Sequence, residues 1–108
     1  MRTDFERALP PEWEPMALLF SALGDPYRQK ILLLFEGDEQ LTAGQIADAS
    51  PLARTTVSHH LKILRQAHVL LSEKKGKEVF FWLNTPFIHE TFSNVLTYLD
   101  TSSSKESV

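Results

Sequence analysis

The chain has 108 residues, 43% of them apolar, and a formal net charge of −3. This length predicts one domain with one hydrophobic core, and its apolar runs are far too short to cross a bilayer. The lack of cysteine excludes disulfides, thiolate metal sites and thiol redox switches. The acidic total, taken alone, argues against a nucleic-acid-binding protein.

The N-terminal part is predicted to be an irregular arm followed by a helix. Residues 1–11 form the arm, which the Pro10-Pro11 pair ends. They contain no apolar stretch of the kind a secretory signal needs, so we expect a cytoplasmic protein. Apolar residues at helical spacing follow from Glu12, and Gly24 is expected to stop that helix.

Two capping signals predict the next two helices. Asp25 can cap a second helix that has Pro26 in its first position and is expected to continue to Gly37. Thr42 and Gln45 have the spacing of a capping box and predict a short third helix.

The period of the apolar residues changes after a fourth helix. The Ser50-Pro51 turn is expected to lead into a helix over residues 53–67. Residues 69–72 and 78–83 then alternate as strands do, and Gly76 favours a tight hairpin between them.

A last helix is predicted from Thr85, where Pro86 follows at a position that suits a first turn. The domain is expected to cover residues 12–100, and the polar, Ser-rich residues 101–108 are expected to be a disordered tail. The predicted fold is therefore mainly α with a β-hairpin, in the order α-α-α-α-β-β-α.

The net charge is distributed unevenly along the chain. Residues 1–51 carry −5, residues 52–78 carry +4 and residues 79–108 carry −2. Because the Debye length at physiological salt is about 8 Å, a local patch acts through its own sign. The basic segment contains the fourth helix and the hairpin. Its positive charge favours contact with nucleic acid there, although the total charge of the chain is negative.

The fourth helix divides into two faces. Its apolar stripe has the spacing i, i+3, i+4, i+7 and consists of Val57, His60, Leu61 and Leu64. The opposite face carries short hydrogen-bonding side chains and cations, and the hairpin tip adds three lysines. A helix that reads DNA needs this division, since donors and acceptors reach base edges while cations contact phosphates. With the short helix before it, the segment is predicted to be a helix-turn-helix.

Two separate motifs resemble the ArsR/SmtB family of winged-helix repressors. Residues 56–65, Thr-Val-Ser-His-His-Leu-Lys-Ile-Leu-Arg, are similar to the recognition helix of that family, and residues 23–32, Leu-Gly-Asp-Pro-Tyr-Arg-Gln-Lys-Ile-Leu, are similar to its second-helix entry. The hairpin over residues 69–84 matches the wing, and the resemblance covers about residues 16–98. It implies a winged helix-turn-helix fold and a homodimeric repressor that binds a palindromic operator and is released by an effector.

The resemblance also assigns site residues. The DNA-binding residues of the recognition helix would be Arg54, Thr55, Thr56, Ser58, His59, Lys62 and Arg65. Those of the wing would be Lys74, Lys75 and Lys77. Dimerisation would use the first and last helices, through Leu19, Phe20, Phe92, Val95 and Leu99. This agrees with the residues themselves, since they add more apolar surface than one small core covers. One departure is Ala53, where the family often has a capping Ser or Thr; Ser50 is the alternative cap if the helix starts earlier.

No sequence motif identifies the effector. Metal sensors of this family use cysteines, which are absent here, or a pattern on the last helix of Asp-x-His followed by His-x-x-His or His-x-x-Glu. Only His89 and Asp100 fall at positions of that second pattern, and two ligands leave transition-metal coordination incomplete. We therefore predict no metal site and no cofactor.

Two other classes of function are weighed against DNA binding. An enzyme is not favoured, because the neighbours Ser58, His59 and His60 point in different directions on a helix and no phosphate loop or catalytic metal motif occurs. A winged-helix module that binds only protein partners is the alternative. It would need an apolar outer face on the fourth helix, and that face is polar.

Overall fold

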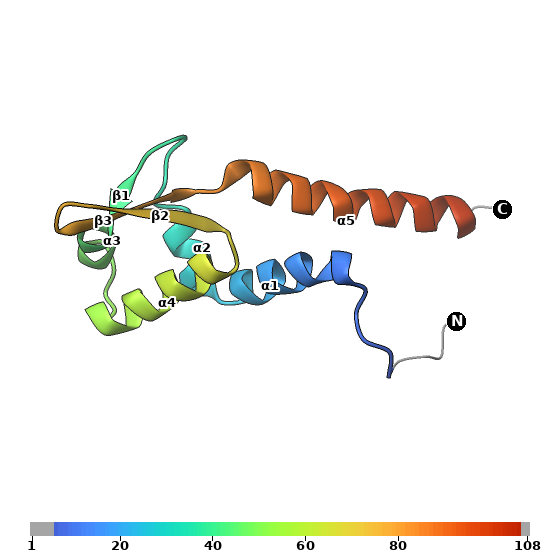
Figure 1. Ribbon diagram of the computed structural model, residues 1–108, viewed down its shortest axis with the longest axis horizontal. Coiled ribbons are helices and arrows are strands. Elements are labelled where there is room, and N and C mark those ends of the chain that lie inside the picture. Colours follow the sequence, from blue (N-terminus) through green and yellow to red (C-terminus); the bar gives the residue numbers. More distant parts are fainter. Residues whose placement is uncertain (1–5, 107–108) are drawn as a thin grey trace.

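The computed structural model describes residues 6–106, and it has a head and two projecting helices (Figure 1). The sheet lies in the head with α2, α3 and α4, whereas α1 and α5 extend away from it. Its elements are η1 (Pro11–Trp13), α1 (Glu14–Leu23), α2 (Pro26–Leu32), β1 (Leu41–Thr42), α3 (Ala43–Asp48), α4 (Arg54–Gln66), β2 (Leu70–Lys75), β3 (Glu78–Leu83) and α5 (Thr85–Glu106). The predicted fold class, mainly α with a β-hairpin, is confirmed.

The sheet has three antiparallel strands in the order β1-β3-β2. The hairpin pairs Leu70 with Leu83 at its base and Lys75 with Glu78 at its tip. Strand β1 pairs Leu41 with Phe81 and was not predicted. Two residues are too few to show an alternating pattern, so only the pairing partner on β3 defines this strand.

The predicted end of α1 and start of α2 agree with the structure, but α1 begins at Glu14 and not at Glu12, and α2 is shorter than expected. Asp25 caps α2 and Gly24 ends α1. Helix α2 ends at Leu32 instead of continuing to Gly37, and the next residues form tighter turns in which the Leu34 and Phe35 N–H groups bond carbonyls three residues back. Because residues 31–35 are all apolar, their pattern carries no sign of where the helix ends.

Helix α5 is longer than expected. It continues to Glu106, six residues into the segment predicted to be disordered, while residues 107–108 lie outside the described part of the chain. No proline or glycine follows Pro86, and serine costs a helix only about 0.5 kcal/mol per residue. Nothing in the sequence therefore forces the helix to stop at residue 100.

The core lies where α1, α3, α4 and β2 meet. Its largest fully buried side chains are Leu19, Val57, Ile46, Leu64, Val69 and Leu70. Since α1, α3 and β2 all pack on the inner side of α4, the core holds that helix rigidly and leaves its outer side free.

Candidate nucleic-acid interface

Helices α3 and α4 form the predicted helix-turn-helix. The Thr42 Oγ1 accepts from the Gln45 N–H at 3.1 Å, and the Gln45 Oε1 accepts from the Thr42 N–H at 2.8 Å. Both halves of the expected capping box are present, so two N–H groups at the start of α3 have partners.

The start of α4 has no side-chain cap. Helix α4 begins at Arg54 after Ala53, whose backbone carbonyl accepts the first helical bond from the Val57 N–H. Ser50 does not replace the missing cap, because its Oγ accepts from the Leu52 N–H at 3.1 Å and so holds the turn. The other N–H groups at this helix end are left to water or to a bound anion.

The two faces of α4 are separated as predicted. Val57, His60, Leu61 and Leu64 are buried, which confirms the packing role expected for His60. The side chains assigned to DNA are all exposed, namely Arg54, Thr55, Thr56, Ser58, His59, Lys62 and Arg65. Their contact with DNA stays a prediction, but the fold presents them together on the outer side of one rigid helix.

A hydrogen-bonded arginine on α2 holds the inner side of α4. The Arg28 side chain is 14% exposed. It donates from Nε to the Ala22 carbonyl and from Nη2 to the Ser21 carbonyl, and its Nη1 lies 3.3 Å from the His60 Nδ1. The Tyr27 ring stacks on the His60 ring, with centroids 6.2 Å apart. The buried face of α4 is thus tied to α2 and to the end of α1.

The carboxylate of Asp25 organises this arginine and the start of α2. Its Oδ1 accepts from the Tyr27 N–H at 2.7 Å and the Arg28 N–H at 3.4 Å, and its Oδ2 lies 3.7 Å from Arg28 Nη1. Desolvation by burial acts to raise the pKa of Asp25, but these backbone bonds and the charges of Arg28 and His60 outweigh it, so the pKa lies below the ordinary value of 3.8.

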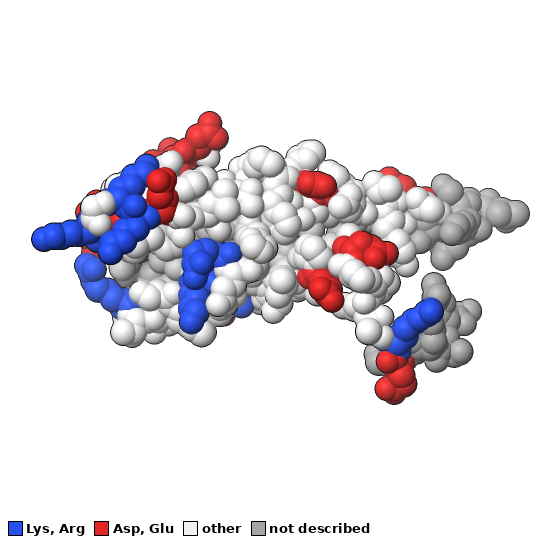
Figure 2. Space-filling model, in the orientation of Figure 1, with Lys and Arg blue, Asp and Glu red and all other residues white. Residues whose placement is uncertain are grey.

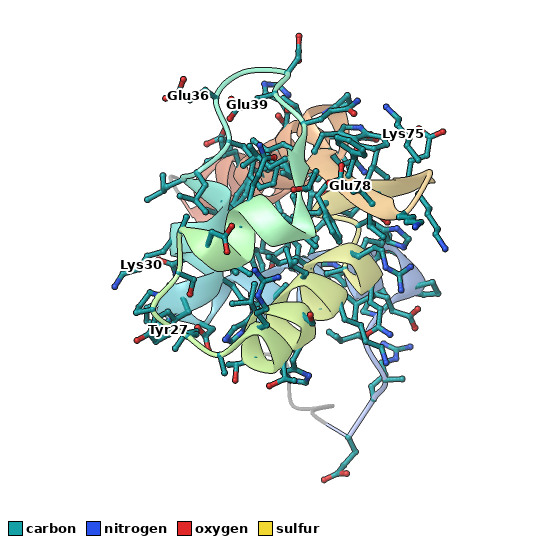
Figure 3. The ribbon with its side chains drawn as sticks, turned by 90° about the vertical axis from the view of Figure 1, so that its left-hand side faces the viewer. Tyr27, Lys30, Glu36, Glu39, Lys75 and Glu78 are labelled. Carbon is teal, nitrogen blue, oxygen red and sulfur yellow. The ribbon has the colours of Figure 1, made fainter. Side chains whose placement is uncertain are left out.

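The β2–β3 hairpin carries the predicted wing lysines. Gly76 has a φ of +66° in the turn, a conformation that suits glycine, and Lys74, Lys75 and Lys77 are exposed. The Lys75 Nζ lies 3.1 Å from the Gln40 Oε1 and 5.1 Å from the centre of the Phe80 ring. Figure 3 shows Lys75 and Glu78 on the side of the head away from Tyr27 and Lys30.

The cations of α4 and of the wing lie at one end of the molecule. Figure 2 shows most of the visible Lys and Arg atoms at the end that holds the sheet and α4, while the charged atoms over α1 and α5 are mostly those of Asp and Glu. Between α4 and β3 lies a cavity of about 320 Å³ that Ser58, Lys62 and Arg65 line. The cations of residues 52–78 thus gather at the end that holds α4 and the hairpin, where carboxylates also lie.

The predicted DNA-binding residue Arg54 forms an ion pair with a carboxylate. The Arg54 Nη2 lies 2.9 Å from the Asp48 Oδ1, and both side chains are more than 70% exposed. Exposed pairs of this kind contribute only about 0–1 kcal/mol. A phosphate can thus replace Asp48 as the partner of Arg54 at little cost.

The projecting helices expose an apolar surface, which we call the α1–α5 surface. It consists of Leu18, Phe20, Phe92, Leu96, Tyr98 and Leu99, all at least 41% exposed. The Phe20 and Phe92 rings, 6.3 Å apart, join the two helices. Sequence reasoning missed Leu18, Leu96 and Tyr98 as interface candidates, although Leu96 shares a helical face with Phe92.

Two of the residues assigned to dimerisation, Leu19 and Val95, are less exposed than the others. Leu19 is completely buried in the core of its own chain, so the expectation that it adds to an exposed apolar surface is wrong. Its neighbours Leu18 and Phe20 point outward instead. Val95 is half-buried and borders the α1–α5 surface.

The candidate metal ligands are not brought together within one chain. His89 and Asp100 are 11 residues apart on α5, which corresponds to about 16 Å along the helix axis. Within residues 6–106, no three His, Asp or Glu side chains gather in a way that could hold a metal ion. No helix in the same range is long and apolar enough to cross a membrane.

Comparison with known proteins relates the chain to transcriptional regulators. A family model described as a helix-turn-helix domain matches residues 23–73. The transcriptional repressor SdpR of Bacillus subtilis is 37% identical over 82 residues, which is 76% of this chain and 90% of that protein. A transcriptional repressor SmtB homolog of Synechocystis is 29% identical over 82% of this chain and 67% of that protein.

Solved structures show the same fold. An ArsR-like transcriptional regulator from Rhodococcus superposes with a TM-score of 0.75, covering 90% of each chain at 23% identity. At that identity the likeness concerns the fold alone.

Proposed function

Because the chain belongs to the ArsR/SmtB family of helix-turn-helix transcriptional regulators, which bind DNA and are not enzymes, we propose that it acts as a homodimeric repressor of a palindromic operator. The regulator is proposed to work in the cytoplasm and to leave its operator when an effector other than a thiol reagent or thiol-bound metal binds.

The observation that carries this proposal is the exposed polar face of α4 beside a lysine-rich hairpin. Ser58 and His59 lie near the N-terminal half of α4, where a helix in the major groove meets base edges. Lys62 and Arg65 follow one and two turns later, where they suit phosphates. The wing lysines flank the same end of the molecule, so helix and hairpin are positioned to contact one duplex together.

The α1–α5 surface supports the homodimer. It leaves six large apolar side chains exposed at the end of the molecule away from the DNA-binding residues. A two-fold pairing through this surface would cover them and present two copies of α4 on the same side. Two such helices read half-sites related by the same two-fold axis, and that predicts a palindromic operator.

Footprinting of the DNA upstream of the gene tests this arrangement. The expected result is one protected region with two-fold symmetry and half-site centres about 10 bp apart or a multiple of it. Protection of a single asymmetric half-site would contradict the dimer. The absence of any protected region, even at the highest protein concentration, would contradict operator binding.

A further inference from the structure

A second candidate binding site lies between α2 and the turn of the helix-turn-helix, away from the predicted DNA contacts. It is a cavity of about 150 Å³. Residues of α2 and the segment after it form one wall, namely Tyr27, Lys30, Ile31 and Leu34; the other consists of Ala49, Ser50, Pro51 and Leu52. Figure 3 shows Tyr27 and Lys30 extending next to each other from α2.

The walls combine an apolar body with one cation. Tyr27 and Leu34 are partly exposed although they are large and apolar, so filling the cavity would remove apolar surface from water. The Lys30 Nζ lies 5.2 Å from the centre of the Tyr27 ring. No carboxylate of the described residues pairs with it. The cavity therefore offers an aromatic contact and a free positive charge at its rim.

The size and charge select a class of ligand. A volume of about 150 Å³ is large enough for a benzene ring, and an unpaired lysine favours an anion beside that ring. We propose that this cavity is an effector site for a small aromatic carboxylate, with the ring between Tyr27 and Pro51 and the carboxylate on Lys30. The effector role rests on the proposed function, whereas the binding of the carboxylate does not.

The cavity has a direct connection to the DNA-binding helix. Tyr27, on one wall, stacks on His60 in the buried face of α4. Pro51 and Leu52, on the other wall, lie three and two residues before Arg54, the first residue of α4. A ligand bound between these walls stabilises the distance between α2 and the turn at which the ligand fits best. Where that separation differs from the one on DNA, ligand and DNA weaken each other's binding by the same factor.

Binding is tested on the full chain with sodium benzoate as the probe and benzamide as its uncharged analogue, followed by amide chemical shifts in NMR. We expect saturable benzoate binding in the millimolar range, with the largest shifts at Tyr27, Lys30 and Ala49–Leu52. Because Lys30 is exposed, benzamide should bind about three- to fivefold more weakly. Lys30→Met should remove that preference, and Lys30→Arg should keep it.

A second pair of variants tests the location. Ala49→Leu fills the cavity and should abolish benzoate binding, while the matched Ala49→Ser leaves it open and should bind as the wild type does. An unchanged benzoate affinity in Ala49→Leu, equal affinities for benzoate and benzamide in the wild type, or no benzoate binding at all would each overturn the site.

The effector role has its own readout. Benzoate should weaken the binding of the wild type to its upstream DNA and leave that of Lys30→Met unchanged, although both proteins bind the DNA equally without benzoate. Benzoate bound in the cavity with no effect on DNA affinity would overturn the effector role. A wild type that fails to bind the DNA without benzoate would instead contradict the proposed function, and the NMR titration still decides whether the cavity binds the carboxylate.

Discussion

The Arg28 Nη1 lies 3.3 Å from the His60 Nδ1 and thereby joins α2 to the buried side of the helix that we propose reads DNA. The same guanidinium also bonds two carbonyls at the end of α1. One side chain therefore connects α1, α2 and α4, and with them the projecting helix α1 to the DNA-binding end.

Replacement of Arg28 should destabilise the fold. Arg28→Ala leaves the Ala22 carbonyl without its arginine donor and leaves the Ser21 carbonyl with the Gly24 N–H alone, so we expect the free energy of unfolding to fall by about 1–3 kcal/mol. Arg28→Lys keeps the charge but lacks the planar fork, so it should recover only part of that loss. Urea unfolding followed by circular dichroism measures both. Full recovery by lysine would mean that charge, not the set of hydrogen bonds, is what matters.

Alanine at Ser58 or His59 should reduce sequence discrimination. Each side chain lies on the outer face of α4 in the half that we expect at the base edges. We expect the difference in binding free energy between operator and scrambled DNA to fall by about 1–3 kcal/mol for each change. Lys62→Ala is the matched comparison and should weaken binding to both DNAs alike. If Ser58→Ala or His59→Ala does the same, the residue contacts phosphate and not a base.

The stability of the protein should depend on pH through Asp25. Its pKa is lower in the folded chain than the ordinary value of 3.8, so the unfolded chain takes up the proton first as the pH falls. The stabilisation is therefore complete above the unfolded pKa and is lost as the pH falls through the folded pKa.

Asp25→Asn isolates this effect, because asparagine keeps an oxygen that can cap α2 but carries no charge. Urea unfolding between pH 6 and pH 2.5 should show the wild type more stable than the variant at the upper end and the two converging toward the lower end. A difference that stays constant over this range would contradict the assignment to the charge of Asp25.

A charge in the α1–α5 surface should prevent dimerisation. Leu96 is 60% exposed in the single chain, so Leu96→Glu should leave the fold intact while placing a carboxylate in the proposed interface. Sedimentation equilibrium should then give the mass of a monomer, against a dimer for the wild type. Leu33→Glu is the control. Leu33 is 82% exposed on the head, away from the proposed interface, so this variant should remain a dimer. A dimer in Leu96→Glu would place the interface elsewhere.

Features that depend on neighbours in the sequence were predicted well. Asp25 at the start of α2 and the Thr42–Gln45 capping box are local, since each needs only residues two or three positions away. The two faces of α4 follow from the helical period alone. These local signals were enough to place the DNA-binding candidates on one exposed face.

Features that depend on distant residues were not predicted. Strand β1 exists because Leu41 meets Phe81, and the contact between Arg28 and His60 spans 32 positions. Leu19 and Phe20 are adjacent and similarly apolar, yet only the packing of α1 on the core decides that Leu19 is buried. The cavity beside Tyr27 arises in the same way, from two segments brought together by the fold.

Fluorescence anisotropy with the DNA upstream of the gene, compared with a scrambled duplex at about 50–300 mM salt, measures whether the protein binds DNA sequence-specifically. We expect tight binding to the upstream DNA and weak binding to the scrambled duplex. For both duplexes the logarithm of the affinity should fall linearly with the logarithm of the salt concentration, because phosphate contacts release counterions. Equal affinity for the two duplexes, or an affinity that does not change with salt, would contradict sequence-specific DNA binding by the outer face of α4 and the wing.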